Sequence, residues 1–249
     1  MPLLFTFGSG LFMILGLLIV FLTKNNRKVV DLSISIAFGV MLMLIFIELL
    51  PEAYEKLSEQ LPIPQSMILL IGFVILGALL LKVLDLFVPD HDIQKQNTTV
   101  SENLFHIGLV SSIALILHNL IEGMAIYSTV TTDASMGILV TIGVGLHNIP
   151  MGMVVTSTFY QANTNKKKTT LFVVLIALST LLGGLVMFFL SEMVTSLVLG
   201  ILLSVTLGML VYIVIFELLE EMMHNHNPKI TYIGIAIGIF LFLLTLFFE

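Results

Sequence analysis

Two short segments carry side chains that could bind a metal ion. In the first, His118 precedes Glu122 by four residues, so the two side chains stack on one face of a helix, with Asn119 at its flank. The second segment repeats the pattern with His147, Asn148 and Met151. Two imidazoles, a carboxylate and carboxamide oxygens suit a divalent transition metal such as Zn²⁺. The alternative is a buried hydrogen-bond network that only holds two helices together.

Both segments lie deep within apolar runs of the sequence. His118 is about 14 residues into the run 104–128 and His147 about 13 into the run 134–160, so at about 1.5 Å per residue both approach a bilayer midplane. A carboxylate at that depth costs about 2.5 kcal/mol or more and is normally kept for a pathway or a paired site. The same His-Asn dipeptide on both helices favours the metal site over the plain network.

The composition excludes several classes of protein. Of 249 residues, 58% are hydrophobic and 10% are charged, whereas a soluble domain has about a quarter of its residues charged. The net charge of −6 with only 10 Lys and Arg leaves no basic patch for nucleic acid. The absence of cysteine excludes disulfides, thiolate metal sites and iron–sulfur clusters. The chain is therefore expected to be an all-α integral membrane protein in the lipid bilayer.

Eight apolar runs are long enough to span the hydrocarbon core as helices, which takes about 20 residues each. Together they form a single polytopic membrane domain over 1–249, and the first run lacks the basic start and cleavage site of a signal peptide. The longest connection holds His91 between two Asp residues, which could bind a metal or be an ordinary solvated loop. The predicted helices are 3–23, 30–50, 66–87, 104–128, 134–160, 168–190, 197–219 and 229–248.

The positive charges predict the orientation of these helices. Nine of the ten Lys and Arg residues fall on one side of an eight-helix chain, and only Lys56 falls on the other. Because positive loops face the cytoplasm, the prediction is a multi-pass protein of the cell membrane with both termini extracytoplasmic.

The sequence contains an inverted internal repeat. The segment from Gly39 to Glu52 matches the segment from Gly208 to Glu221 at a constant offset of 169 residues, in helices predicted to run in opposite directions. The His-Asn segments of 104–128 and 134–160 form a second such pair. Inverted repeats of this kind are typical of secondary transporters, and they predict a bundle of three helices, a central pair and three helices.

Acidic residues recur at helical spacing near the ends of two helices. They could concentrate cations at the two mouths of a pathway, or simply form solvated helix ends, the reading that weighs most for Glu55 and Glu59. The predicted pathway residues are Glu48 and Glu52 near one end, and Glu217, Glu221 and His224 near the other.

Three further residues shape the central pair of helices. Pro150 removes its own N–H and frees the carbonyl of Leu146, which membrane helices tolerate beside a cavity, water or an ion. Gly123 and Gly152 are expected to let the two helices approach each other closely.

These motifs resemble the ZIP (Zrt/Irt-like) family of divalent metal transporters, in its bacterial zinc-transporter-like branch. The resemblance rests on the His-Asn-x-x-Glu-Gly segment at 118–123, the His-Asn-x-Pro-x-Gly segment at 147–152 and Glu-Leu-Leu-Pro-Glu at 48–52. It implies transport of Zn²⁺, and often Fe²⁺, Mn²⁺ or Cd²⁺, toward the cytoplasm. It also implies that His118, Glu122 and His147 form the metal site, with Asn119 and Asn148 at its edge. An elevator motion would slide helices 3–23, 104–128, 134–160 and 168–190 against the other four.

The chain departs from the family pattern at the predicted site. The family usually has Glu where this chain has Met151 and Pro where it has Ile121, and the helix 168–190 holds no Asp, Glu or His. We therefore expect one carboxylate, two imidazoles and a thioether, rather than a full centre for two metals.

The leading hypothesis is a secondary transporter with metal as its substrate, no cofactor and a homodimer as a possible assembly. The alternatives are a membrane-embedded metal-dependent hydrolase and a metal-binding membrane protein without flux. The sequence lacks H-E-x-x-H, G-x-S-x-G and G-x-x-x-x-G-K-[ST], and acidic faces at both ends favour a two-sided pathway. We therefore expect a protein that is not an enzyme.

Overall fold

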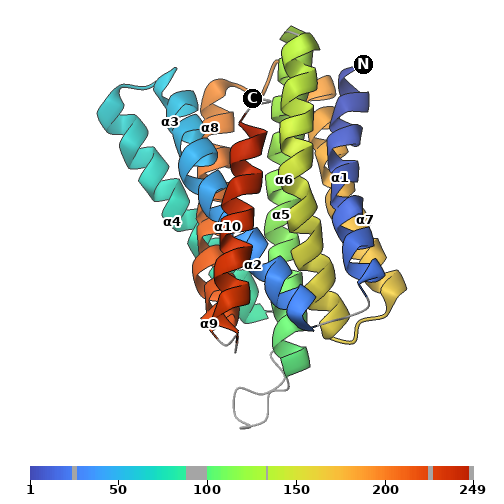
Figure 1. The fold of residues 1–249 in the computed structure, drawn as a ribbon. Coiled ribbons are helices and arrows are strands. Elements are labelled where there is room, and N and C mark those ends of the chain that lie inside the picture. Colours follow the sequence, from blue (N-terminus) through green and yellow to red (C-terminus); the bar gives the residue numbers. More distant parts are fainter. Residues whose placement is uncertain (24–26, 88–99, 133, 224–226, 247–249) are drawn as a thin grey trace.

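The computed structural model describes residues 1–23, 27–87, 100–132, 134–223 and 227–246 (Figure 1). Eight helical stretches are long and apolar enough to cross a membrane, and the described residues contain no strand. The prediction of an all-α membrane protein is confirmed. The elements are α1 (Pro2–Leu22), α2 (Arg27–Met43), the π-helical turn η1 (Leu44–Leu49), α3 (Leu50–Ser58), α4 (Ile63–Phe87), α5 (Val100–Thr132), α6 (Ala134–Gln161), α7 (Lys166–Leu190), α8 (Ser196–Tyr212), the π-helical turn η2 (Ile213–Leu218), α9 (Leu219–Met223) and α10 (Pro228–Thr245).

Each predicted helix is present, but two extend well beyond the predicted ends. The helix expected at 30–50 continues through η1 into α3 and ends at Ser58, and the helix expected at 104–128 runs from Val100 to Thr132 as α5. Hydropathy marks where a helix leaves the hydrocarbon, not where its hydrogen bonds stop. Glu and Lys are good helix formers, so α3 carries its polar residues as a continuation of the membrane helix.

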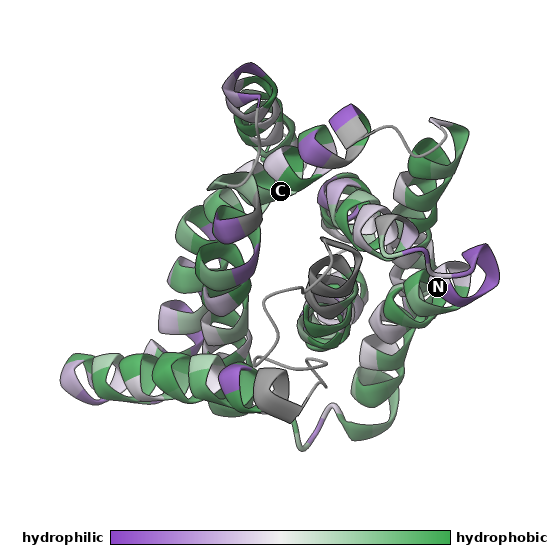
Figure 2. Cartoon of the chain, turned by 90° about the horizontal axis from the view of Figure 1, so that it is seen from below, coloured by the Kyte–Doolittle hydropathy of each residue, from purple (hydrophilic) through white to green (hydrophobic). Residues whose placement is uncertain are grey.

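The helices form two groups. One group is α1, α5, α6 and α7, and the other is α2 with η1 and α3, α4, α8 with η2 and α9, and α10. The groups meet where α6 packs against α2 and α10, and where α5 packs against α8 and η2. Apolar residues predominate along the helices when the molecule is seen from below (Figure 2). The two helices that carry the His-Asn segments therefore lie in one group and face the other.

Glycines set the close helix contacts inside the first group. A Cβ atom at Gly123 would overlap the backbone of Thr180 in α7, and a Cβ atom at Gly152 would overlap the backbone of Met13 in α1. The expectation that these glycines bring α5 and α6 together is thus wrong, because neither glycine faces the other central helix. Each glycine instead fixes one central helix to a different outer helix, because small residues face whichever helix approaches most closely.

The inverted repeat is visible in the structure as well as in the sequence. The two π-helical turns η1 and η2 begin and end at residues that differ by 169, the offset of the sequence repeat. The buried positions of the two helices also match at this offset, namely Ile34 with Leu203, Ala37 with Thr206, Met41 with Leu210, Leu44 with Ile213, Ile45 with Val214, Leu49 with Leu218 and Ala53 with Met222.

Each π turn changes which residues face the core. In an uninterrupted α-helix, Glu48 would lie two turns beyond Met41 on the same face. A π turn adds one residue to the helix, so Leu49 continues the buried stripe instead and Glu48 is displaced to its flank. The corresponding turn in the other helix sets Glu217 beside Leu218.

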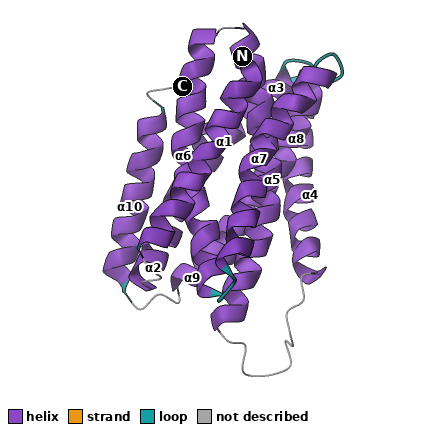
Figure 3. Cartoon of the chain, turned by 90° about the vertical axis from the view of Figure 1, so that its right-hand side faces the viewer, coloured by secondary structure: helices purple, strands orange, loops and turns teal. Residues whose placement is uncertain are grey.

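Both chain termini lie at the same end of the bundle (Figures 1 and 3). The first residues of α2, α7 and α10, where Arg27, Lys166 and Lys229 stand, lie at the opposite end. The short loops joining antiparallel helices produce this arrangement, and it segregates the positive charges as the sequence predicted.

Candidate metal centre

The candidate metal centre lies between α5 and α6, halfway along both helices. α5 carries His118 and Glu122 one turn apart, and α6 carries His147. The helix α6 stays α-helical through Pro150, so the freed carbonyl of Leu146 occurs in a continuous helix and not at a break. Because the two helices pack directly on each other, side chains from neighbouring turns meet across the contact.

Both imidazoles converge on a single carboxylate oxygen. Glu122 Oε1 lies 2.7 Å from His118 Nε2 and 2.6 Å from His147 Nε2, and the two imidazole ring centroids are 6.1 Å apart. His118 and His147 are each 1% exposed and Glu122 is 7% exposed. A buried carboxylate is costly unless it is paired and hydrogen-bonded, and here two ring nitrogens provide the pairing.

The three side chains fit a tetrahedral metal ion with little movement. Their ligand atoms all lie within 4.8 Å of one another. Ligands at about 2.0–2.1 Å from a tetrahedral Zn²⁺ lie roughly 3.3 Å from each other, so each Nε2–Oε1 pair need separate by only roughly 0.6 Å. At 2.6–2.7 Å each Nε2 donates a hydrogen to the carboxylate, and the same nitrogen would face the metal. Metal binding therefore requires each imidazole to give up its Nε2 proton and to bind as the neutral ring protonated on Nδ1.

The two asparagines occupy different surroundings. Asn148 Nδ2 lies 3.5 Å from Glu122 Oε2 and so extends the centre. Asn119 Nδ2 instead donates to the carbonyl oxygen of Ile176 in α7 at 3.2 Å and contacts the Met13 sulfur in α1 at 3.8 Å. Asn148 therefore adjoins the metal ligands, whereas the amide nitrogen of Asn119 ties α5 to α7 and α1. The sequence pattern carried no signal for these partners of Asn119.

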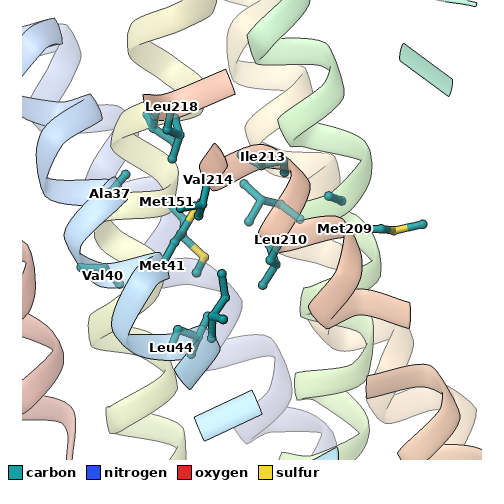
Figure 4. Packing of buried hydrophobic residues seen from close by; sticks show 14 of the residues in the cluster. Ala37, Val40, Met41, Leu44, Met151, Met209, Leu210, Ile213, Val214 and Leu218 are labelled. Carbon is teal, nitrogen blue, oxygen red and sulfur yellow. The ribbon is translucent and has the colours of Figure 1, made fainter. Parts of the chain in front are cut away.

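Met151 is fully buried one turn after His147. Figure 4 shows its side chain among those of Met41 from α2 and Val214 from η2, within one hydrophobic cluster. The position beside His147 on the helix follows from the four-residue spacing. Met151 is thus one point at which the helix that carries His147 contacts the other helix group.

The predicted pathway residues lie outside this centre. Glu48 in η1 and Glu52 in α3 are half-buried, and Glu217 in η2 is 8% exposed. The side chain of Glu221, the residue His224 and the residue His91 lie outside what the structure describes.

Farther along the acidic face, Glu59 accepts a hydrogen bond from Lys56 at 2.8 Å and another from Ser196. The hydrogen bond from Lys56 holds the pKa of the Glu59 carboxyl below its usual value. Glu59 therefore links α3 to α8 at the end of the bundle that holds the termini.

Comparisons with known proteins agree on one family. The family described as ZIP Zinc transporter matches residues 89–246, the part of the chain that holds the candidate centre. A protein named Zinc transporter ZupT from Streptococcus mutans serotype c is 31% identical over 96% of this chain and 93% of its own length. Relatives of the same name from Chlorobaculum parvum and Clostridium perfringens are 30% and 28% identical, covering 89% and 96% of this chain and 88% and 92% of their own lengths.

Proposed function

Because the chain belongs to the ZIP zinc transporter family, we propose that it moves Zn²⁺ across the cell membrane into the cytoplasm. Family membership makes the protein a multi-pass membrane transporter of divalent metal and not an enzyme. The hydrolase considered from the sequence is therefore set aside. The metal ion is the substrate of this protein, and Fe²⁺, Mn²⁺ and Cd²⁺ are proposed as further substrates.

One observation carries the proposal of a binding site. Two buried imidazole nitrogens lie within 2.7 Å of one carboxylate oxygen, in the middle of two packed membrane helices. We propose that His118, Glu122 and His147 bind the transported ion, with Asn119, Asn148 and Met151 around it. Two neutral imidazoles and one carboxylate favour Zn²⁺ and Cd²⁺ over ions that rely on oxygen ligands.

The direction of transport rests on charge. Nine of the ten Lys and Arg residues fall on the side opposite the termini, and positive loops face the cytoplasm. The membrane potential, negative inside, then draws a divalent cation inward by about 2.3 kcal/mol per charge per 100 mV. Glu48 and Glu52 would attract the ion on the outer side, and Glu217, Glu221 and His224 would line its release.

The test is uptake of Zn²⁺, Fe²⁺, Mn²⁺ and Cd²⁺ into proteoliposomes that hold the purified protein, with protein-free liposomes as the blank. We expect saturable Zn²⁺ uptake that an inside-negative potential accelerates. Calorimetric binding of Zn²⁺ without uptake would support the alternative of a metal-binding membrane protein without flux. The proposed homodimer is tested separately, by the molecular mass of the protein in detergent.

A further inference from the structure

Hydroxyl side chains lie along the halves of α5 and α6 that lead from the metal centre to the end opposite the termini. Three of them are satisfied by their own helix: Ser112 donates to the carbonyl of Gly108 at 2.6 Å, Thr156 to that of Gly152 at 2.6 Å, and Thr158 to that of Val154 at 3.0 Å. This is the usual arrangement of Ser and Thr within a helix, where the carbonyl one turn earlier is always within reach.

Ser111 and Ser157 differ from these neighbours. They are 1% and 0% exposed, yet their hydroxyl oxygens have no hydrogen-bond partner among the described residues. A buried polar group without a partner is destabilising, and such groups in native proteins usually mark a water, an ion or a functional role. Ser112 and Thr156 each donate to the backbone carbonyl one turn earlier in their own helix. Ser111 and Ser157 have the same kind of carbonyl within reach, but they do not bond to it.

The two hydroxyls lie at different distances from the centre, on the same side of it along their helices. Ser111 is seven residues from His118, which sets it two turns away on the same face, about 10 Å from the centre. Ser157 is ten residues beyond His147, about 15 Å along α6. A Cβ atom at Gly108 would contact Thr158. The turn of α6 that holds Thr158 therefore faces the turn of α5 that precedes Ser111. The two hydroxyls are thus successive steps between the centre and the helix end.

The neighbours of α6 indicate which way Ser157 faces. Thr158 points toward α5 through its approach to Gly108, and Tyr160 points toward α1, where its ring centroid lies 5.6 Å from that of Phe21. At about 100° per residue, Ser157 lies about 60° from Tyr160 and about 100° from Thr158 around the helix axis.

We propose that Ser111 and Ser157 form a neutral polar step that receives a partly hydrated divalent cation between the metal centre and the cytoplasm. The inference rests on the proposed function and adds a second binding position to it. A hydroxyl can accept from water or ligate a cation through oxygen, and it carries no charge that would trap the ion. Conduction requires such weak sites, since an ion that binds too tightly does not leave.

The inverted repeat matches one of the two hydroxyls and not the other. At the offset of 29 residues that relates the two His-Asn segments, position 111 in α5 corresponds to Val140 in α6, whereas position 157 in α6 corresponds to Ser128 in α5.

The first test uses the absence of cysteine from the chain, so that one introduced thiol is the only reactive one. Ser111→Cys and Ser157→Cys are treated in proteoliposomes with a small cationic methanethiosulfonate, with Ser112→Cys and Thr156→Cys as matched controls. We expect the first pair to react at least about tenfold faster than the controls, because the proposal places only these two side chains on the path of hydrated ions. Zn²⁺ should slow that reaction. Equal rates in all four variants would overturn the inference.

The second test measures transport. Ser111→Ala and Ser157→Ala should lower the maximal rate of Zn²⁺ uptake by about tenfold, the effect of losing one hydrogen-bond-strength contact, with calorimetric Zn²⁺ binding at the centre unchanged. Ser112→Ala should transport as the parent does. Parental rates in both alanine variants would refute the step while leaving the proposed function intact. Absence of uptake by the unmodified protein would overturn both the proposed function and this inference, because a binding step on a transport route requires transport.

Discussion

Glu122 is the central residue of the proposed metal site, because its Oε1 lies within 2.7 Å of both imidazole nitrogens. Without the carboxylate, a divalent cation between two neutral imidazoles would keep its full charge in a medium of low dielectric. The two histidines in turn compensate the buried carboxylate. Each of the three side chains is therefore expected to be necessary for binding.

His118→Ala and Glu122→Ala should each weaken Zn²⁺ binding by about a hundredfold or more and abolish saturable uptake, since loss even of groups that only orient metal ligands costs 10–100-fold. The variants should remain folded in detergent, because α5 keeps its glycine contact with α7. Calorimetry, uptake and thermal unfolding measure the three quantities. Glu59→Gln, which changes a carboxylate at the end of the bundle, is the control. Unchanged uptake in both alanine variants would disprove the site.

Met151→Glu should strengthen binding by at least about tenfold, with the largest relative gain for Mn²⁺. A second carboxylate adds attraction for a divalent cation at short range, and Mn²⁺ depends most on oxygen ligands. Isothermal calorimetry with Zn²⁺, Mn²⁺ and Cd²⁺ provides the measurement, and a second bound metal is a further expected result. Met151→Leu, which keeps the apolar volume, should bind metal as the parent does. If Met151→Glu leaves stoichiometry and all three affinities unchanged, position 151 faces away from the metal.

Much of the centre could be predicted from residue spacing alone. The four-residue interval between His118 and Glu122 sets both on one helical face, and the repeated His-Asn dipeptide identified the second helix. Spacing along one helix says nothing of the partners across helices, however. The bond from Asn119 to the carbonyl of Ile176 and the packing of Met151 with Met41 depend on rotations and distances between helices.

At the scale of the element, the π turns decide how the acidic residues are presented. Glu48 and Glu217 lie within η1 and η2, at equivalent positions of oppositely directed helices. The turns themselves could not be predicted, because an insertion of one residue in a helix leaves no composition signal. The sequence shows only that Glu48 follows Met41 by seven residues; the burial of Leu49 in place of Glu48 is seen in the structure alone.

Glu48→Gln and Glu217→Gln should each slow Zn²⁺ uptake by about three- to tenfold at low ionic strength, because each carboxylate would attract the cation at one end of the route. High salt should reduce the effect of Glu48→Gln, a half-buried position, more than that of Glu217→Gln, since Glu217 is 8% exposed and buried charges are screened less. Zn²⁺ binding at the centre should persist in both. Uptake rates over a series of salt concentrations, with calorimetry alongside, check this. Glu55→Gln, farther along the same acidic face and exposed, is the comparison variant. Loss of binding at the centre in either variant would contradict the assignment to the mouths.

At the scale of the whole molecule, the proposed orientation rests on charge, and the two helix groups follow from packing. Hydropathy predicted the eight membrane-spanning helices, and the distribution of Lys and Arg predicted which of their ends face the cytoplasm. The division into two groups, with α5 and α6 in one and facing the other, required the three-dimensional contacts. Glycine pattern alone assigned Gly123 and Gly152 to the wrong neighbours, since a small residue shows that a helix is close and not which helix it is.

Single cysteines should report the orientation. In intact cells, a membrane-impermeant thiol reagent should label Gln60→Cys, which is exposed near the end that holds the termini, and should leave Thr23→Cys, exposed at the other end, unlabelled until the cells are lysed. The reason is the cytoplasmic position of the basic loops. The unmodified chain, which has no cysteine, is the blank. The reverse labelling pattern would show that the protein is inserted the other way round.

The paired π turns also set the rotation of the helix segments that follow them. If η1 became regular α-helix, every residue beyond it would turn by about 100° about the helix axis, and Glu48 would move from the flank onto the buried stripe. Burying a carboxylate more deeply costs free energy, so the π turn keeps Glu48 in its half-buried position.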